Sequence, residues 1–230
     1  MLTLLIATRN DHKVGEIRAI LSERFNYLTL RDFPGAPNVV EDAPTFAGNA
    51  TKKAVELAEG LASEPLSDGK TGSPLFVLAD DSGLEVDALN GAPGVHSARF
   101  AAQDAKLSGN TTDADNNAKL LRLLREVPAG RRKARFRCVL ALTQVFALST
   151  SSVGVVNEAD HQTRLFDGVC EGQIGFELSG AGGFGYDPLF IPTGLQQTFA
   201  ELGDAAKNQL SHRAKALEKL RHYLDSVPGR

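Results

Sequence analysis

The first 25 residues join an apolar run to an amphipathic segment, and this order restricts the possible folds more than any other feature of the chain. Residues 2–7 are almost wholly apolar, which predicts a buried strand. Apolar residues then recur at helical spacing in Val14–Phe25, and Asn10 and Asp11 precede this segment as capping residues. A strand, a short loop and a helix are typical of α/β proteins, which bind ligands beyond the carboxyl ends of their strands.

The rest of the chain mixes helical and strand patterns. Helices are predicted over 45–61, 112–127 and 211–224, the last two capped by Thr112 and Ser211. Strands are predicted over 75–79, 84–88, 134–142 and 189–192. Surface loops are predicted over 63–74, which is rich in Ser, Gly and Pro, and over the polar residues 149–167. We expect one α/β domain over residues 1–230, with a mixed central sheet flanked by helices.

Charge and composition exclude several classes of protein. Lys and Arg total 25 against 28 Asp and Glu, which argues against a protein that binds a nucleic-acid polymer, because such binding requires a basic face. The apolar run at the start is too short to cross a membrane, and no other segment approaches the required length. Cys138 and Cys170 are far apart without a CxxC spacing, which favours two reduced thiols and a cytoplasmic protein.

The segment Asp80-Asp81-Ser82-Gly83 follows an apolar strand and is the strongest candidate for chemistry. Side chains of adjacent residues in an extended chain point to opposite sides, so one aspartate can face a site while the other supports it. Two neighbouring carboxylates also repel each other unless a proton or a cation lies between them, and Mg²⁺ prefers oxygen ligands. The alternative is a solvated turn between two strands.

A second acidic pair, Glu41-Asp42, precedes the second predicted helix, where Asn49 and Lys53 lie four residues apart on one face. Lys53 is placed to meet a triphosphate. The alternatives are that the acidic pair only complements the helix dipole and that Lys53 is a solvated surface residue.

The first loop brings polar donors to the start of a helix, which is a natural site for an anion. Its residues are Thr8, Arg9, Asn10, Asp11, His12 and Lys13. The loop lacks the glycines of a Walker sequence, so ordinary P-loop chemistry is disfavoured.

Residues 180–185 match the string GxGxxG, but their context opposes a dinucleotide site. Such a fingerprint must open a helix, whereas Pro188 follows closely and disfavours one. The segment instead suits a loop that presents Phe184 and Tyr186 for stacking on a base, with Asp187 as an acceptor. The alternative is a glycine-rich turn with two core aromatic residues.

Donors also gather at the last predicted helix, where His212 and Arg213 follow its cap and Lys207 lies just upstream. They suit contact with a ring carbonyl oxygen. Charged residues in a first helical turn are, however, commonly solvated.

These motifs, in this order, resemble the inosine triphosphate pyrophosphatase family. The resemblance covers nearly the whole chain through ATRNDHK, TFAGNATKKA, LADDSGLEVDALNGAPGVHSARF, RFRCVLAL, GFGYDPLF and SHRAKAL. It implies an elongated mixed-sheet α/β fold with a nucleotide cleft between two lobes, and a homodimer. It also implies Mg²⁺-dependent hydrolysis of the triphosphates of inosine, deoxyinosine and xanthosine to the monophosphate and pyrophosphate, which cleanses the nucleotide pool.

The resemblance also assigns roles to residues. Glu41 and Asp81 match magnesium positions, and Asp81 also matches the proton acceptor, supported by Asp80 and Lys53. Residues that match phosphate, base or other nucleotide contacts are Thr8, Asn10, Lys13, Ser82, Phe184, Gly185, Tyr186, Asp187, Lys207, His212 and Arg213. Arg9 stands at a variable place in the first loop, where it is expected to add affinity for phosphate.

Two other classes of protein remain open at this stage. A non-catalytic nucleotide-binding or regulatory protein would keep the loops but would not require Asp81. A phosphatase that forms an aspartyl-phosphate normally carries D-x-D at a strand end, whereas this chain has Asp-Asp-Ser. The reaction product distinguishes the three classes.

Overall fold

The computed structural model describes residues 2–63, 74–105, 109–145 and 162–226. The loop predicted over 63–74 lies almost entirely outside these ranges, as does most of the loop predicted over 149–167. The last residues of the loop predicted over 149–167 do not form a loop, because strand β5 begins at Arg164. Phe166 is buried there, so a core-facing side chain stabilises a strand within a polar stretch of sequence.

The strands of the described residues form one six-stranded sheet in the order β2-β1-β3-β4-β5-β6. β1 pairs in parallel with both β2 and β3, whereas β5 and β6 are antiparallel. The predicted mixed α/β sheet is therefore confirmed. The strands are β1 (Thr3–Ile6), β2 (Asn26–Thr29), β3 (Leu75–Val86), β4 (Lys133–Gln144), β5 (Arg164–Ile174) and β6 (Phe190–Pro192).

The helices are α1 (Asp11–Leu21), α2 (Phe46–Ser63), α3 (Ala102–Ala105), α4 (Asp113–Leu123), α5 (Phe199–Leu210) and α6 (His212–Ser226). Short 3₁₀ helices occupy Ser22–Arg24, Leu30–Asp32, Asp87–Leu89, Gly94–Arg99 and Ala129–Arg131. None of the helices in the described part of the chain has both the length and the apolar composition needed to span a bilayer.

Helix α4 ends earlier than the sequence predicts, and helix α5 was not predicted at all. α4 stops at Leu123 rather than Val127, and the Arg132 guanidinium donates to the carbonyl oxygens of Leu124 and Val127 just beyond that end. α5 has no predicted counterpart, because Gly203 has a positive φ of 77° and interrupts the helical periodicity. The capping box of Thr198 and Glu201 was the available signal for α5.

The chain divides into two compact units, which are described separately. The first unit comprises residues 1–81, 139–166 and 219–230, and the second comprises residues 82–138 and 167–218. The boundary in β3 therefore falls between Asp81 and Ser82, which are consecutive residues.

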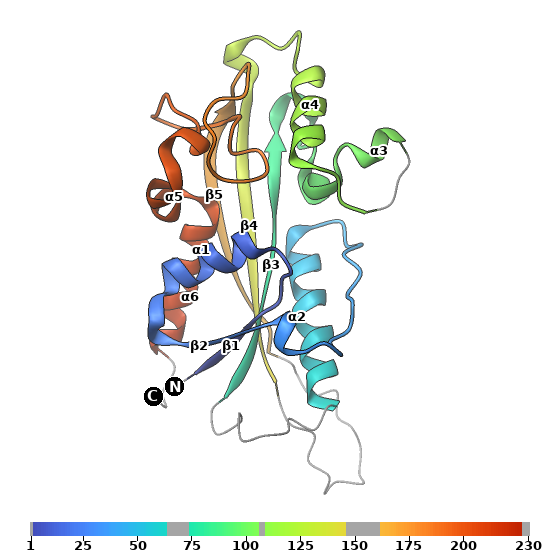
Figure 1. Cartoon of the computed structure of the whole chain (residues 1–230), viewed down its shortest axis with the longest axis vertical. Coiled ribbons are helices and arrows are strands. Elements are labelled where there is room, and N and C mark those ends of the chain that lie inside the picture. The colour runs from blue at the N-terminus through green and yellow to red at the C-terminus, as the bar shows by residue number, and fades with distance from the viewer. Residues whose placement is uncertain (1, 64–73, 106–108, 146–161, 227–230) are drawn as a thin grey trace, which may run out of the picture. The chain divides into compact units, whose positions relative to one another are not determined.

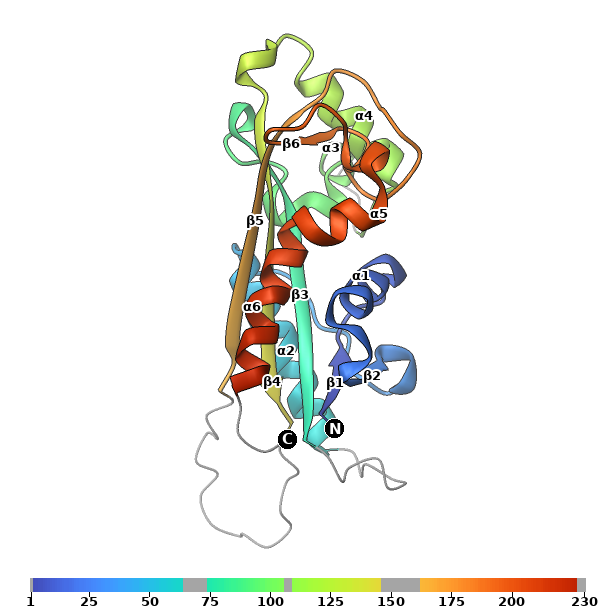
Figure 2. The ribbon, with the colours of Figure 1, turned by 90° about the vertical axis from the view of Figure 1, so that its left-hand side faces the viewer.

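In the first unit, α1 and α2 lie on opposite faces of β1 and β3 (Figure 1 and Figure 2). Leu5, Ile6 and Val77 are fully buried in these strands, as expected for parallel strands covered on both faces. Ile17 of α1 and Leu57 of α2 supply buried side chains from the two helices. Together they place the carboxyl end of β1 and the middle of β3 between two helices.

The second unit has its own aromatic core. The ring centroids of Phe136 and Phe190 are 4.6 Å apart, and those of Phe190 and Phe199 are 5.5 Å apart. Tyr186 belongs to the same buried cluster, and its hydroxyl donates to the carbonyl oxygen of Ser97 at 2.9 Å. This packing anchors one end of the segment that the sequence analysis assigned to the base.

Candidate active site

The Asp80-Asp81-Ser82-Gly83 segment lies within one continuous strand, β3, and does not form a turn between two strands. The prediction of separate strands over 75–79 and 84–88 was therefore wrong. Asp80 and Asp81 are only 1% and 6% exposed, and both have polar partners from neighbouring helices. These partners stabilise two carboxylates inside a strand that local sequence alone would interrupt.

Asp80 forms an ion pair with Lys13 of α1. The side chain of Lys13 is 17% exposed and that of Asp80 is 1% exposed, so the lysine links a buried carboxylate to the surface. The backbone carbonyl oxygen of Asp80 also accepts a hydrogen bond from the Lys53 ammonium at 3.0 Å. Asp80 thus gathers two lysines that lie far apart in the sequence.

Asp81 is held by an amide rather than by a cation. Asn49 of α2 is fully buried, and its side-chain N–H donates to Asp81 Oδ2 at 3.0 Å. The Asn49 Oδ1 accepts from the backbone N–H of Ala43 at 2.8 Å, which fixes the orientation of the amide. The helical spacing predicted Asn49 and Lys53 on one face of the helix, but the bond from Asn49 to Asp81 joins residues 32 positions apart and had no signal in the sequence.

Burial raises the pKa of Asp81 from its ordinary value of 3.8 to about 6. The Asn49 hydrogen bond and the positive charge of Lys13 oppose that rise, whereas the Glu41 carboxylate adds to it. A carboxylate with a pKa close to neutral is suited to accept a proton during a reaction.

Glu41 forms an ion pair with Lys53 of α2. Glu41 and Asp81, the two positions matched to magnesium, both belong to the first unit. Within the described residues, no group of three or more His, Cys, Asp and Glu is arranged to hold a metal. Mg²⁺ is, however, commonly bound by one or two carboxylates together with waters and substrate phosphates. The repulsion between Glu41 and Asp81 is the kind of interaction that a cation relieves, so the residues fit the ion.

The first predicted loop leads into α1, and Asn10 caps the helix as expected. Asn10 Oδ1 accepts from the backbone N–H groups of His12 and Lys13, at 2.9 and 3.2 Å. Thr8 Oγ1 accepts from the Asn10 backbone N–H at 3.2 Å. Arg9 and His12 are exposed, and Asp11 is also exposed but pairs with Arg31 at 2.7 Å. The structure therefore brings Lys13 to the buried carboxylates and leaves Arg9, Asp11 and His12 at the surface.

In the second unit, the glycine-rich loop (residues 180–187) is held by its own last residue. Asp187 Oδ2 accepts from the Phe184 backbone N–H at 2.8 Å and from the Lys207 ammonium at 2.6 Å. Gly183 has φ +74°, and a Cβ there would lie 2.2 Å from Asp187 Oδ2, so only glycine fits. The Lys207 ammonium also lies 4.0 Å from the centroid of the Phe184 ring.

Of the remaining predicted residues of this unit, Arg213 lies near Ser82 and Phe184, whereas His212 and Tyr186 are buried against other residues. Arg213 is 1% exposed, donates to Ser82 Oγ at 2.8 Å and lies 6.0 Å from the Phe184 ring centroid. His212 is also buried and stacks on Phe136 with 4.8 Å between centroids. Tyr186 is buried in the core, so its ring does not present an open face for stacking, and only Phe184 is partly exposed.

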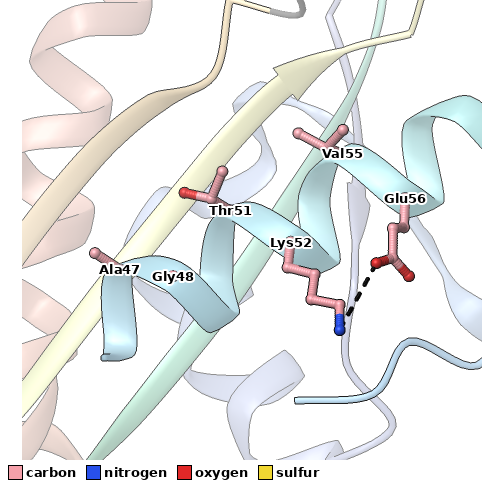
Figure 3. Close-up of a pocket in the computed structure, with 6 residues that line it drawn as sticks. All are labelled: Ala47, Gly48, Thr51, Lys52, Val55 and Glu56. Carbon is pink, nitrogen blue, oxygen red and sulfur yellow. Dashed lines mark ion pairs between the residues drawn. The ribbon is translucent and has the colours of Figure 1, made fainter. Parts of the chain in front are cut away.

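A pocket of about 500 Å³ lies along α2, and it contains none of the predicted site residues. Figure 3 shows two of its lining residues, Lys52 and Glu56, joined by an ion pair, and the distance between their charged atoms is 4.0 Å. The pocket is otherwise lined by Ala47, Gly48, Thr51 and Val55. Its small and mostly apolar lining does not resemble a site for phosphates.

Comparison with known proteins decides the family. A model described as the Ham1 family matches residues 4–223. This chain belongs to the Ham1 family. The expected resemblance to inosine triphosphate pyrophosphatases is thereby confirmed.

Curated and solved relatives cover the Ham1 chain almost completely. A dITP/XTP pyrophosphatase of Desulforamulus reducens is 45% identical over 225 residues, which are 97% of this chain and 96% of that protein. One of Geobacillus kaustophilus is 43% identical over 100% of this chain and 97% of that protein. A HAM1 protein structure from Coxiella burnetii has a TM-score of 0.77 and 36% identity, and covers 99% of this chain and 100% of that one.

Proposed function

We propose that this Ham1 chain hydrolyses the triphosphates of inosine, deoxyinosine and xanthosine to the monophosphate and pyrophosphate, and so cleanses the nucleotide pool. Its class, nucleoside-triphosphate pyrophosphatase, is confirmed by curated relatives of near full-length similarity. The observation that carries the mechanism is the buried Asp81, whose pKa is raised to about 6 beside lysines and a second carboxylate.

The first unit supplies the groups proposed to bind the triphosphate. Lys13 and Lys53 are both partly exposed at the carboxylate cluster, and each neutralises negative charge there. Because the backbone N–H groups of His12 and Lys13 in the first turn of α1 are already bound to Asn10, phosphate contacts are assigned to the Lys13 ammonium, Arg9 and the Thr8 hydroxyl. Phosphoryl transfer depends mainly on positioning and electrostatic stabilisation, which these groups provide.

Glu41 and Asp81 are the residues proposed to hold Mg²⁺. The ion would neutralise phosphate charge when bound and polarise the phosphorus that is attacked. Lys53 pairs with Glu41 and also with the Asp80 carbonyl oxygen, so it positions one proposed ligand relative to β3.

Asp81 is proposed to accept the proton of the attacking water. The water oxygen then bonds to the α-phosphorus while the bond to the bridging oxygen breaks, and pyrophosphate leaves. The Asn49 amide occupies Asp81 Oδ2 and leaves Oδ1 for the water or the ion. Asp80, which is paired with Lys13, supports this arrangement without taking the proton.

The second unit supplies the groups proposed for the purine. Phe184 is the stacking residue, because Tyr186 is committed to the core. His212 and Arg213 are proposed to donate toward a 6-oxo group, Ser82 and Lys207 to support nucleotide contacts, and Gly185 and Asp187 to shape the loop. A 6-amino purine would oppose a donor with a donor, and unmatched buried polar groups discriminate strongly.

A homodimer and a cytoplasmic location remain part of the proposal. Cys138 and Cys170 are both buried thiols, which agrees with a reducing compartment. Sedimentation equilibrium tests the dimer directly.

The proposed function is tested by product analysis with the triphosphates of inosine, xanthosine, adenosine and guanosine, with and without Mg²⁺. Pyrophosphate from the first two, lost on chelation, is the expected result. Asp81→Asn should lower turnover by at least about 10²-fold, as expected for loss of a general base. Asp42→Asn is the matched control, because Asp42 is an exposed carboxylate paired with Lys52. Orthophosphate as the product, or full activity of Asp81→Asn, would refute the mechanism.

A further inference from the structure

Two side chains of α4 hold the backbone of Gly185 from both ends of that residue. Asp113 Oδ2 accepts from the Gly185 N–H at 2.6 Å, and the Asn117 side-chain N–H donates to the Gly185 carbonyl oxygen at 2.9 Å. Asp113 and Asn117 are four residues apart and therefore share one face of the helix. Gly185 has φ +64°, and α4 binds both polar groups of its backbone in that conformation.

The glycine-rich loop thus has two separate attachments. Lys207 of α5 holds it through Asp187, whereas Asp113 and Asn117 of α4 hold it through Gly185. Phe184 directly precedes Gly185, and its own backbone N–H donates to Asp187 Oδ2 at 2.8 Å. Both attachments therefore restrain the backbone that carries the Phe184 ring, one through Gly185 and the other through Asp187.

Asn117 has a buried polar atom that lowers stability, and its hydrogen bond to Gly185 accounts for an asparagine at this position. It is 4% exposed, and its Oδ1 is buried without a hydrogen-bond partner among the described residues. An unsatisfied buried acceptor destabilises a folded protein, and an apolar side chain would avoid that cost. The donor to the Gly185 carbonyl is the interaction that an apolar side chain cannot provide.

We infer that Asp113 and Asn117 are positioning residues that set the selectivity for 6-oxopurines, because they fix Gly185 and thereby the ring of Phe184. This inference rests on the proposed function. A loop must be ordered before it can discriminate between bases, and residues on a rigid helix supply that order before the substrate binds.

The test compares kcat/KM for inosine and adenosine triphosphates in four variants. Asp113→Ala and Asn117→Leu each remove one attachment, Asp113→Asn keeps an acceptor oxygen, and Asp115→Ala is the matched control. Asp115 is an exposed carboxylate in the same helical turn, but it bonds Thr112 rather than the loop. Hydrogen exchange of residues 180–190 reports the order of the loop independently of activity.

The expected result is a selectivity ratio about tenfold lower in Asp113→Ala and Asn117→Leu, equivalent to one lost hydrogen bond to a charged or buried group. Exchange in the loop should be faster in both, while kcat with inosine triphosphate stays within about threefold. Asp113→Asn should restore the ratio, and Asp115→Ala should leave it unchanged.

Two outcomes separate this inference from the proposed function. Suppose that the wild-type protein releases pyrophosphate. If the variants then keep the wild-type ratio of kcat/KM for the two nucleotides, including by losing activity equally with both, the inference is wrong and the proposed function stands. If the wild-type protein releases no pyrophosphate, the proposed function is wrong. The selectivity is then measured by calorimetry, as the ratio of the affinities for inosine and adenosine triphosphates. Failure to bind either nucleotide would overturn the inference as well.

Discussion

The polar clusters of the two units balance their charges differently. In the first unit, the carboxylates Glu41, Asp80 and Asp81 outnumber the lysines Lys13 and Lys53, and Asp81 is bound by an amide. In the second unit, Asp187 and Lys207 form a pair in which both side chains are almost fully buried, at 2% and 3% exposed. The first cluster has a surplus of negative charge, whereas the second pair is compensated internally.

This difference indicates different tasks. Burial, with a smaller contribution from the nearby Glu41 carboxylate, raises the pKa of Asp81, and binding of a proton or a cation relieves the cost of that buried charge, as chemistry at a phosphate requires. A buried and compensated pair instead fixes the shape of a loop, because neither partner can leave without exposing a charge to an apolar environment. The predictions below test this contrast through stability, from the largest expected effect to the smallest.

Lys207→Met should cause the largest loss of stability. It leaves the buried Asp187 carboxylate without its cation, and breaking a buried pair in this way typically costs about 3–5 kcal/mol. Urea denaturation monitored by circular dichroism measures the change in the free energy of unfolding. Lys215→Met is the control, since Lys215 is an exposed lysine that donates to a backbone carbonyl. Equal losses in the two variants would show that the buried pair has no special role.

Asp81→Asn should increase stability at high pH. The folded-state pKa of Asp81, about 6, lies above its ordinary value of 3.8, so its contribution is favourable below pH 4 and is lost as the pH rises through 6. Ionised Asp81 therefore costs up to about 3 kcal/mol at pH 8. Without Mg²⁺, the variant should gain about that much at pH 8 and almost nothing at pH 4. A gain that does not depend on pH would contradict the raised pKa.

Asn49→Leu should have an intermediate effect. The substitution removes the hydrogen bonds to Ala43 N–H and to Asp81, and leaves buried groups without partners. A loss of about 2 kcal/mol in the free energy of unfolding is expected. Asn38→Leu, at an exposed asparagine, is the control. If Asn49→Leu behaved like that control, the bridge to Asp81 would have no energetic role.

Asp11→Ala should have the smallest effect. Asp11 and Arg31 are 72% and 78% exposed, and exposed ion pairs contribute little to stability. The melting temperature, measured by differential scanning calorimetry, should not change detectably. A clear decrease would mean that the surface of the first loop contributes more than its exposure indicates.

Local signals in the sequence predicted the elements and their caps. Asn10, Thr112 and Ser211 each accept hydrogen bonds from backbone N–H groups of the helices they precede, as expected. These contacts join residues two or three positions apart, so the sequence contains all the information that they need. The elements that were missed, such as α5, depend on an internal glycine or on core contacts with distant residues.

The sequence by itself determined the family, the mixed α/β class and the kinds of side chain at the site. Only the tertiary structure decided which of them meet. In the folded chain Asp80 pairs with Lys13, Asp81 accepts from the Asn49 amide, and β3 is continuous through both aspartates. Tyr186 is buried, whereas Phe184 is partly exposed. The physical reason is that Lys13 lies 67 residues from Asp80 and Asn49 lies 32 from Asp81. Burial and pairing at such separations arise from the packing of whole elements, which no local pattern encodes.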